Sequence, residues 1–352
     1  MTRNATPAAL GFRMPAEWEP HAATWLAWPH ERRDWPGKFA TVAWVYGEVV
    51  RHLVPHERVR ILVDDAAAAG RAGALLARVG VDLARVDFVR IPTDRSWTRD
   101  FCPLFVRHDG GEVALTDWKF NAWAKYPNWR RDDAVPARVA RQQRRRHWTP
   151  VHDGRRVVLE GGSIDVNGRG TLLTTEECLL SPVQARNPGL ARADLEGILG
   201  AHLGIRKVLW LGRGIAGDDT HGHIDDLARF VDPRTVVIAA EDDPADVNFA
   251  PLRENRERLV HMTDQDGAPL RVVPLPMPAP LVLDGQRLPA SYANFYVANG
   301  VVLVPTFNDP RDRDALAILA PLFPGRRVVG IHAVDLVWGL GTLHCMTQQE
   351  PV

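Results

Sequence analysis

Short apolar runs rich in Val, Ile and Leu recur along the chain and constrain its fold more than any other feature. Their length and their Gly, Pro or acidic boundaries are typical of strands. The runs are Val59–Val63, Val86–Ile91, Val157–Leu159, Val208–Leu211, Val236–Ala240, Val301–Val304 and Val328–Ile331. Helical periodicity lies between several of them, over residues 39–53, 66–79 and 312–322. Strands interleaved with helices predict an α/β fold, although the irregular spacing shows no internal repeat and composition marks no domain boundary.

Two segments interrupt this pattern and are expected to be loops or lids. Residues 117–134 hold three of the twelve tryptophans, and Pro274–Pro280 holds four prolines. The basic run Arg141–Arg146 is expected to be a solvated helix face. Lys plus Arg and Asp plus Glu number 43 each. Because the chain carries no excess positive charge, we expect it to bind neither nucleic acid nor a membrane surface.

The cysteines indicate a reduced protein. Cys102, Cys178 and Cys345 are too few and too scattered for a disulfide framework, and no C-x-x-C pair suggests a thiolate zinc site. The N-terminal residues lack the apolar core of a signal peptide. No apolar run approaches the ~20 residues that a membrane-spanning helix needs. We therefore expect a cytoplasmic protein.

The segment from Gly217 to Asp226 packs four aspartates and two histidines between apolar runs. Three interpretations are open. His221, His223 and Asp225 alternate, so an extended backbone would place them on one face as metal ligands. Alternatively, His223 is a general base and Asp225 binds a cationic group. In the third interpretation, the segment is a turn whose aspartates cap the backbone.

Cys345 follows Gly339 and Gly341 near the end of the chain, and these glycines are expected to let the backbone approach a ligand closely. A free cysteine is more often a small buried apolar residue than a nucleophile. Because a thiol has a pKa of about 8.5, a catalytic role needs a histidine or a cationic substrate nearby. Asp100 and Glu160 each follow an apolar run, where open α/β sheets place ligand contacts, although each alone is more often a capping or turn carboxylate.

Several common active sites have no support in the sequence. It contains no G-x-x-x-x-G-K-[ST] loop, no G-x-G-x-x-G that opens a helix after a strand, and no G-x-S-x-G. What remains is a thiol, a histidine and a surplus of carboxylates. A planar guanidinium pairs bidentately with carboxylates, so two of them could hold its nitrogens while a thiolate attacks its central carbon. The positive charge of such a substrate would also favour the thiolate.

The chain also resembles the agmatine deiminase family, which belongs to the guanidino-group-modifying enzymes of the pentein fold. The resemblance covers nearly the whole chain, and its motifs are specific in combination. They are Met14–His21, Trp25–His30, Trp97–Asp100, Asp117–Trp123, Leu159–Ile164, Thr171–Leu180, Gly217–Thr220, Gly222–Asp225, Ser291–Tyr296 and His344–Gln349.

This resemblance implies a five-bladed α/β propeller with pseudo-fivefold symmetry, formed by residues 1–352 as a single deiminase domain. It implies that Cys345 is the nucleophile, that His223 is the general acid and base, and that Glu160 orients His223. Asp100 and Asp225 would clamp the guanidinium. No metal or other cofactor is expected, and homo-oligomers are common in the family.

The implied reaction is hydrolytic deimination of a small guanidine through an amidino-cysteine intermediate, with agmatine giving N-carbamoylputrescine and ammonia. Trp97 would pack on the aliphatic stem of the substrate. The chain departs from the family pattern at Cys102, His221 and Thr342. A mostly uncharged His221 would bind a second cation less well than the usual aspartate, and Thr342 lacks the usual asparagine amide. Alternatives are a deiminase of free or peptidyl arginine and an amidinotransferase.

Overall fold

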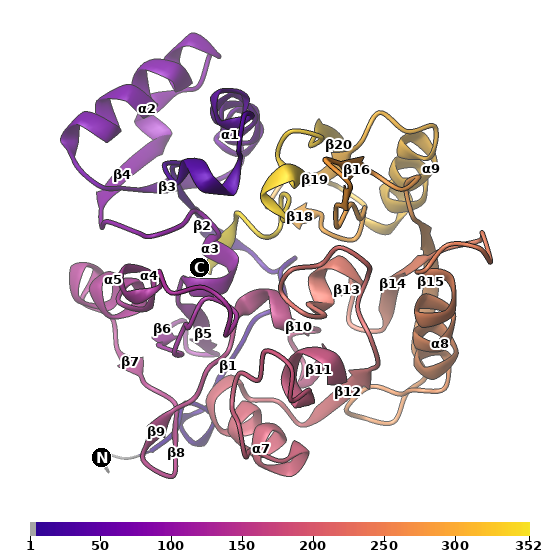
Figure 1. The fold of residues 1–352 in the computed structure, drawn as a ribbon. Coiled ribbons are helices and arrows are strands. Elements are labelled where there is room, and N and C mark those ends of the chain that lie inside the picture. The colour runs from indigo at the N-terminus through magenta and orange to yellow at the C-terminus, as the bar shows by residue number, and fades with distance from the viewer. Residues whose placement is uncertain (1–4) are drawn as a thin grey trace.

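One arrangement of strands recurs around the computed structural model, which describes residues 5–352 (Figure 1). In each of five sheets formed by these residues, one strand pairs antiparallel with a neighbour, and that neighbour pairs parallel with another strand. Helices connect the parallel strands, because a parallel connection must cross over the sheet. The fold is thus mixed α/β, as predicted, and it contains a repeated sheet topology that the pattern of apolar runs alone did not show.

The strands of these sheets are short, and each sheet has three or four of them. The orders are β21 (Gln348–Pro351), β2 (His21–Ala27), β3 (Arg58–Val63), β4 (Val86–Arg90); β1 (Phe12–Arg13), β5 (Leu104–His108), β6 (Val113–Thr116), β7 (His147–Trp148); β10 (Asp165–Val166), β11 (Thr171–Thr175), β12 (Lys207–Leu211); β13 (Ala228–Phe230), β14 (Thr235–Ala240), β15 (Arg271–Pro276); and β18 (Tyr296–Val297), β19 (Val301–Thr306), β20 (Arg327–His332). Two small hairpins pair β8 (Val151–His152) with β9 (Arg155–Arg156) and β16 (Val282–Leu283) with β17 (Gln286–Arg287).

Most helices lie toward the outside of the molecule (Figure 1). In chain order they are α1 (Phe39–Leu53), α2 (Ala66–Arg78), α3 (Thr98–Phe101), α4 (Arg130–Asp133), α5 (Val135–Gln143), α6 (Glu176–Leu180), α7 (Arg192–Leu203), α8 (Phe249–Val260) and α9 (Arg311–Leu319). All except α3 stand between two parallel strands of one sheet.

The three helical patterns of the sequence are confirmed. Helix α1 has the expected bounds and buries Val42, Tyr46 and Val50. Helix α2 begins after Asp65, whose carboxylate accepts the backbone N–H of Ala68 at 2.7 Å, as a good N-cap does. The third pattern divides into α9 and a 3-10 turn over Ala320–Leu322.

The apolar runs became strands with one exception. Residues 157–159 form no strand, and only Val158 makes an isolated bridge to Lys119. The prediction of a loop over Pro274–Pro280 was also wrong in part, because Pro274 and Pro276 lie within β15. This is possible because β15 is an edge strand of its sheet, where a missing N–H costs no ladder bond.

Two further expectations are refined by the structure. Residues 117–134 are mostly irregular, as expected, but they include α4 and bury Trp118 and Trp123. The basic run is helical only as far as Gln143, because Arg144 adopts a left-handed φ of 53° that ends α5.

Strand β21 ties the end of the chain to its beginning. It pairs antiparallel with β2, with Gln349 opposite Thr24, and the indole N–H of Trp25 donates to the buried Glu350 at 2.8 Å. The C-terminus accordingly lies close to β2 in Figure 1. This pairing fixes the segment that carries Cys345 in the interior.

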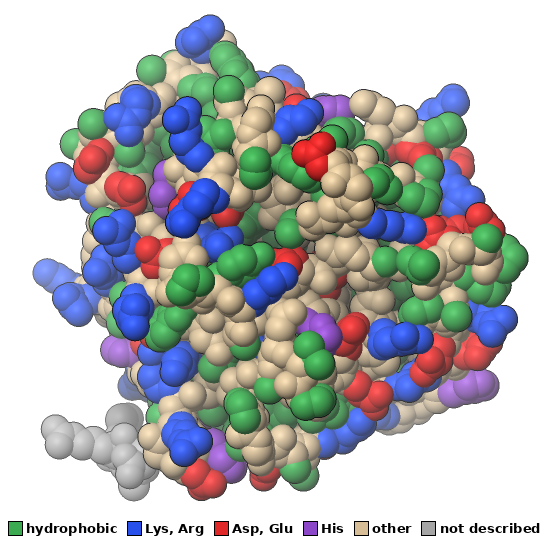
Figure 2. All heavy atoms as spheres, viewed as in Figure 1, with side chains coloured by type: hydrophobic (Ala, Val, Ile, Leu, Met, Phe, Trp, Pro, Cys, Tyr) green, Lys and Arg blue, Asp and Glu red, His purple; other side chains and the backbone are tan. Residues whose placement is uncertain are grey.

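The visible surface mixes charges of both signs. Figure 2 shows Lys and Arg side chains interspersed with Asp and Glu rather than gathered in one field, which agrees with the balanced composition. Among the helices of residues 5–352, none combines the length and apolar character needed to cross a bilayer.

Candidate functional site

The chemically important residues occupy equivalent places in the repeated topology. Each lies a few residues before the first strand of an antiparallel pair. The 3-10 turn over Gly161–Ser163 packs against α3 and against a second turn over Ile224–Asp226, so these loops meet. The residues are Asp100 before β5, Glu160 before β10, His223 and Asp225 before β13, Asn294 before β18, and Cys345 before β21.

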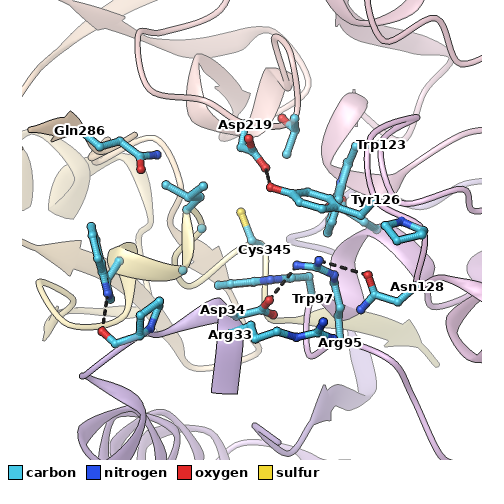
Figure 3. A pocket seen from close by; sticks show the side chains of 18 residues that line it. Arg33, Asp34, Arg95, Trp97, Trp123, Tyr126, Asn128, Asp219, Gln286 and Cys345 are labelled. Atoms are coloured by element: carbon cyan, nitrogen blue, oxygen red, sulfur yellow. Dashed lines mark hydrogen bonds and ion pairs between the residues drawn. The ribbon is translucent and has the colours of Figure 1, made fainter. Parts of the chain in front are cut away.

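A cavity of about 380 Å³ opens onto this meeting point. Cys345, Asp100 and Trp97 line it, whereas Glu160 is fully buried. Figure 3 shows Cys345 and Trp97 near the middle, with Asp34 and Arg95 on one side and Asp219 on the other. The cavity therefore gives access to the Cys345 thiol and is lined by the carboxylates of Asp34, Asp100 and Asp219.

The Cys345 thiol is buried and faces carboxylates. Its Sγ lies 3.8 Å from Oδ2 of Asp225 and accepts from Nδ2 of Asn294 at 3.1 Å. Burial raises the thiol pKa well above its ordinary value, and the charges of Asp225, Asp226 and Asp100 raise it further. The thiol is thus protonated in the free site, and a cation beside these carboxylates would favour its ionisation.

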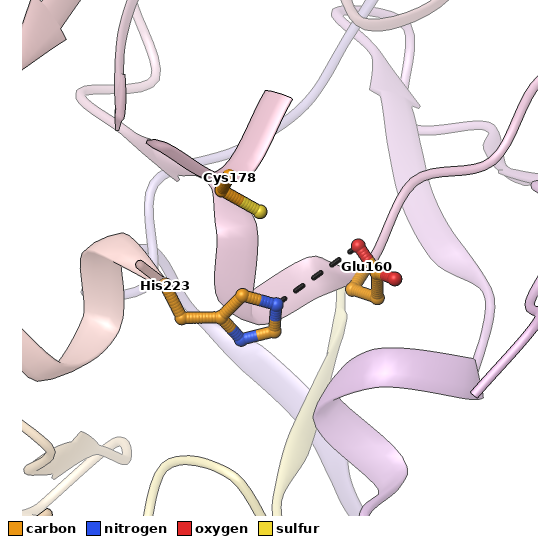
Figure 4. Close-up of side chains that lie close together, drawn as sticks. All are labelled: Glu160, Cys178 and His223. Atoms are coloured by element: carbon orange, nitrogen blue, oxygen red, sulfur yellow. Dashed lines mark ion pairs between the residues drawn. The ribbon is translucent and has the colours of Figure 1, made fainter. Parts of the chain in front are cut away.

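His223 lies between the carboxylates beneath the cavity. Nδ1 is 3.8 Å from Oδ1 of Asp100, and Nε2 is 3.9 Å from Oε2 of Glu160. Burial lowers the pKa of His223, but Asp100, Cys178 and Glu160 raise it and prevail, so that it stands well above its ordinary value. Figure 4 shows Cys178 and Glu160 around the imidazole. The ring is therefore positioned as a proton donor.

Glu160 is held by a buried guanidinium. Nε of Arg186 donates to Oε1 of Glu160 at 3.0 Å, and neither side chain is exposed. Burial alone would raise the pKa of Glu160, but Arg186 and His223 lower it to about 2. Glu160 is thus an anion whose second oxygen, Oε2, faces His223.

Asp100 accepts two hydrogen bonds that fix its carboxylate. The indole Nε1 of Trp123 donates to Oδ2 at 2.9 Å, and the backbone N–H of Gly162 donates to Oδ1 at 3.1 Å. Trp123 stands in a run of three left-handed residues with φ of 50°, 58° and 54°, a costly conformation for side chains with a Cβ. Burial raises the pKa of Asp100 to about 6, assisted by Asp225 and Glu160 and opposed by His223.

Asp225 is fully buried, and one of its carboxylate oxygens contacts His344. Nδ1 of His344 lies 2.7 Å from Oδ2 of Asp225. Burial raises the pKa of Asp225, but the contacts with His344, His223 and Arg229 lower it below its ordinary value. The Asp225 carboxylate is therefore ionised.

Buried polar atoms without hydrogen-bond partners gather here. Within the described part of the chain they include both ring nitrogens of His223, Oε2 of Glu160 and Oδ1 of Asp225. Leaving such atoms unpaired is costly, so the geometry suits a compact polar ligand. Gly162 keeps the space open, because a Cβ there would lie 2.6 Å from Nδ1 of His223 and 2.8 Å from Oδ1 of Asp100.

The metal-ligand interpretation of residues 221–225, one of the three left open, would need His221, His223 and Asp225 on one face, and the structure does not place them so. His221 has a left-handed φ of 66° and contacts Ser181 Oγ at 3.1 Å, while His223 faces Asp100 and Glu160. Two other groups, Glu160–Cys178–His223 and Asp225–Asp226–Cys345, have donor atoms within 4.8 Å of one another. One oxygen of Glu160 is already bound to Arg186.

Sequence reasoning missed several supporting residues and misplaced others. Gly339 and Gly341 line the cavity, and they also make room for the rings of Trp35 and Trp97. Thr342 donates to Oδ1 of Asn294 at 2.6 Å, so Asn294 supplies the amide beside the nucleophile. His221 is not part of the cavity wall. Arg186, Trp123, Asn294 and His344 had no local signal beyond their place in or near the quoted motifs.

Comparison with known proteins agrees with this site. The family model for Porphyromonas-type peptidyl-arginine deiminase matches residues 13–351. An agmatine deiminase of Pseudomonas fluorescens is 39% identical over 99% of this chain and 98% of its own length. The structure of the agmatine deiminase of Enterococcus faecalis superimposes with a TM-score of 0.91 at 33% identity, covering 99% of this chain and 98% of that one. A C. jejuni agmatine deiminase with bound substrate gives 0.84 at 28% identity over 96% of both chains. The chain therefore belongs to the agmatine deiminase family within the Porphyromonas-type peptidyl-arginine deiminases.

Proposed function

We propose that this protein hydrolyses the guanidinium group of agmatine to N-carbamoylputrescine and ammonia. One observation carries the proposal: unpaired buried acceptors lie beside a buried thiol, where Asp225 Oδ1 has no partner among the described residues. A guanidinium offers five N–H donors in a plane. Bound between Asp100 and Asp225, it would supply the missing donors and offset the two negative charges.

Substrate binding also activates the nucleophile. Burial, together with the carboxylates of Asp225 and Asp100, holds the Cys345 proton in the free site. A guanidinium cation placed between them offsets that field, which lowers the thiol pKa and releases the proton. The Cys345 thiolate then attacks the central carbon, and a C–S bond forms to give a tetrahedral adduct.

His223 moves the protons of the later steps. As an imidazolium it protonates the leaving nitrogen, the C–N bond breaks, and ammonia departs. The amidino-cysteine is then attacked by water, whose proton returns to the neutral His223. Collapse of the second adduct breaks the C–S bond and forms the C=O bond of the ureido product, while the hydroxyl proton passes to the departing sulfur and restores the thiol. Glu160, fixed by Arg186, keeps the imidazole oriented and stabilises its charged form.

The cavity beyond the thiol suits a chain that ends in a second cation. Trp97 packs against Trp35 with ring centroids 5.2 Å apart and planes tilted by 44°, and it provides an apolar wall. Two further carboxylates, Asp34 and Asp219, line the same cavity. Oδ2 of Asp34 is buried and has no partner in residues 5–352. Asp34 is paired with Arg95 at 2.7 Å, and Asp219 is paired with Lys125. The acceptor that we propose for a distal ammonium is therefore Oδ2 of Asp34.

The test is ammonia release from a panel of guanidines, comprising agmatine, free arginine, a blocked arginyl peptide, guanidinobutyrate and methylguanidine. Agmatine is expected to have the highest kcat/KM. A folded Cys345→Ala protein is expected to release no ammonia, because nothing replaces the thiolate. Preference for an arginyl peptide would overturn the substrate, and substantial turnover by Cys345→Ala would overturn the mechanism. A new guanidine formed only with an added amine would indicate an amidinotransferase instead.

The finer architecture belongs to the same proposal. The repeated sheet topology supports a propeller of five α/β modules with pseudo-fivefold symmetry and a single deiminase domain. The roles given to Cys345, His223, Glu160, Asp100, Asp225 and Trp97 are proposed on their geometry. Homo-oligomerisation and a cytoplasmic location stay predictions.

A further inference from the structure

A buried chain of charged contacts runs from the clamp to the first loop of the protein. Nε2 of His344 lies 2.7 Å from Oε2 of Glu17, while its Nδ1 faces Asp225 at the same distance. Glu17 is held in turn by Arg229 at 3.0 Å and Arg99 at 3.2 Å. All of these side chains are at least nine-tenths buried. None of these contacts is needed for the proposed chemistry as such.

Both ring nitrogens of His344 face carboxylate oxygens, which accept but do not donate when ionised. The ring therefore donates at both ends if both carboxylates are charged. The cluster also contains Asp165, whose Oδ1 lies 2.9 Å from Nε of Arg229, so three carboxylates face Arg99, Arg229 and the imidazole of His344. A buried cluster of this kind is stable only when its charges compensate.

The contact with His344 also determines which carboxylate oxygen of Asp225 is free to bind a substrate. Oδ2 is taken by Nδ1 of His344, so the carboxylate cannot rotate freely, and Oδ1 remains without a partner in the described residues. The same loop is tied to the other clamp residue. Arg99, next to Asp100, donates its backbone N–H to the carbonyl of Cys345 at 3.1 Å, and its Nε donates to the carbonyl of His344 at 3.3 Å.

We propose that His344 is a positioning residue for the guanidinium clamp: anchored on Glu17, its imidazole holds Oδ2 of Asp225 so that Oδ1 is presented to the substrate. This inference rests on the proposed function and deepens it. It also gives a role to the Met14–His21 motif, since Glu17 acts on the site from 327 residues away along the chain.

Two substitutions of His344 by amide residues test its contact with Asp225 separately from its contact with Glu17. His344→Asn places an N–H donor near the position of Nδ1 and keeps the bond to Asp225. His344→Gln reaches toward Nε2 and keeps the bond to Glu17 but leaves Asp225 without its donor. We expect His344→Gln to raise the KM for agmatine about tenfold, the worth of one charge-assisted hydrogen bond, with a smaller change in kcat. His344→Asn should raise it less.

The pH profile distinguishes positioning from a structural role. The charged groups that face Asp225 are His344, His223, Cys345, Arg229, Asp226 and Asp100. Loss of the His344 donor should raise the pKa of Asp225 and move the acid limb of kcat/KM to higher pH. His21→Asn is the matched control, because His21 is a buried histidine 3.2 Å from Glu57. It should lower Tm without moving the acid limb.

Glu17→Gln keeps the proposal testable if the His344 variants fold poorly, and it should shift the acid limb in the same direction. Agmatine affinity for the Cys345→Ala protein, with and without His344→Gln, gives a readout that does not depend on turnover. The proposal is overturned if KM and acid limb stay at wild-type values in His344→Gln and Glu17→Gln, or if both variants only lose stability as His21→Asn does. An inactive wild type would instead refute the proposed function, and the binding comparison would still decide the role of His344.

Discussion

Replacing Asp100 with Asn is predicted to remove activity. It is also predicted to increase the free energy of unfolding relative to that of the wild type as pH rises. The pKa of Asp100 is raised from 3.8 to about 6, first by burial and then by Asp225 and Glu160. A carboxyl whose folded pKa is raised stabilises the native state while it is protonated. That stability is complete below about pH 3.8 and is lost as pH rises through about 6. Asn stays neutral at every pH and does not incur this loss.

The size of the effect follows from the two pKa values. The full shift of about 2.2 units corresponds to about 3 kcal/mol at 1.36 kcal/mol per unit. Integration of proton binding gives about 1 kcal/mol at pH 4.5 and about 3 kcal/mol at pH 8, a difference of about 2 kcal/mol. Asn also leaves either Trp123 or Gly162 without an acceptor, which costs about 1–3 kcal/mol. Since that cost does not depend on pH, the difference between the two pH values isolates the ionisation of Asp100.

The assay is urea unfolding of the wild type and Asp100→Asn at pH 4.5 and 8, with ammonia release from agmatine at pH 8. The free energy of unfolding of the variant, relative to wild type, should increase by about 2 kcal/mol between the two pH values, while kcat/KM falls to background. A relative stability that is the same at both pH values, or that changes in the opposite direction, would show that Asp100 is not held in a destabilising ionised state. Burial would then not raise the pKa of Asp100 in the folded protein.

Two further variants test the groups that support the site. Arg186→Met removes the cation that keeps Glu160 ionised. We therefore expect kcat to fall about a hundredfold with little change in KM. The control is Arg192→Met, which breaks an exposed ion pair with Glu176 and should leave kcat unchanged. Equal losses in both variants would contradict the role of Arg186. Trp123→Phe keeps a ring but loses the donor that lowers the Asp100 pKa, so the acid limb of kcat/KM should move to higher pH. An unmoved limb, or the same shift in Trp129→Phe, would argue against this hydrogen bond.

The sequence could predict the elements but not the repeat that arranges them. Helix α1 and strands such as β3 and β19 have strong periodicity and clear ends, so local pattern was sufficient. The repeat is hidden because several of its antiparallel strands, β10 and β18 among them, have only two residues. Such strands carry no readable alternation. The sequence likewise could not show that Val157–Leu159 lies where no neighbouring strand is available.

Some residues of the candidate site could be predicted from their sequence motifs, whereas others are recognisable only from their place in the folded structure. Cys345, His223 and Asp225 stand in polar motifs that limit what they can do, and family resemblance gave them roles. Arg186 and Glu17 look like ordinary surface charges in the sequence, yet each is buried against a carboxylate or histidine of the site. Glu17 reaches the site because β21, near the C-terminus, pairs with β2, near the N-terminus. This pairing places His344 in contact with Glu17. A mutation in that first loop should therefore act on guanidinium binding as directly as one beside the nucleophile.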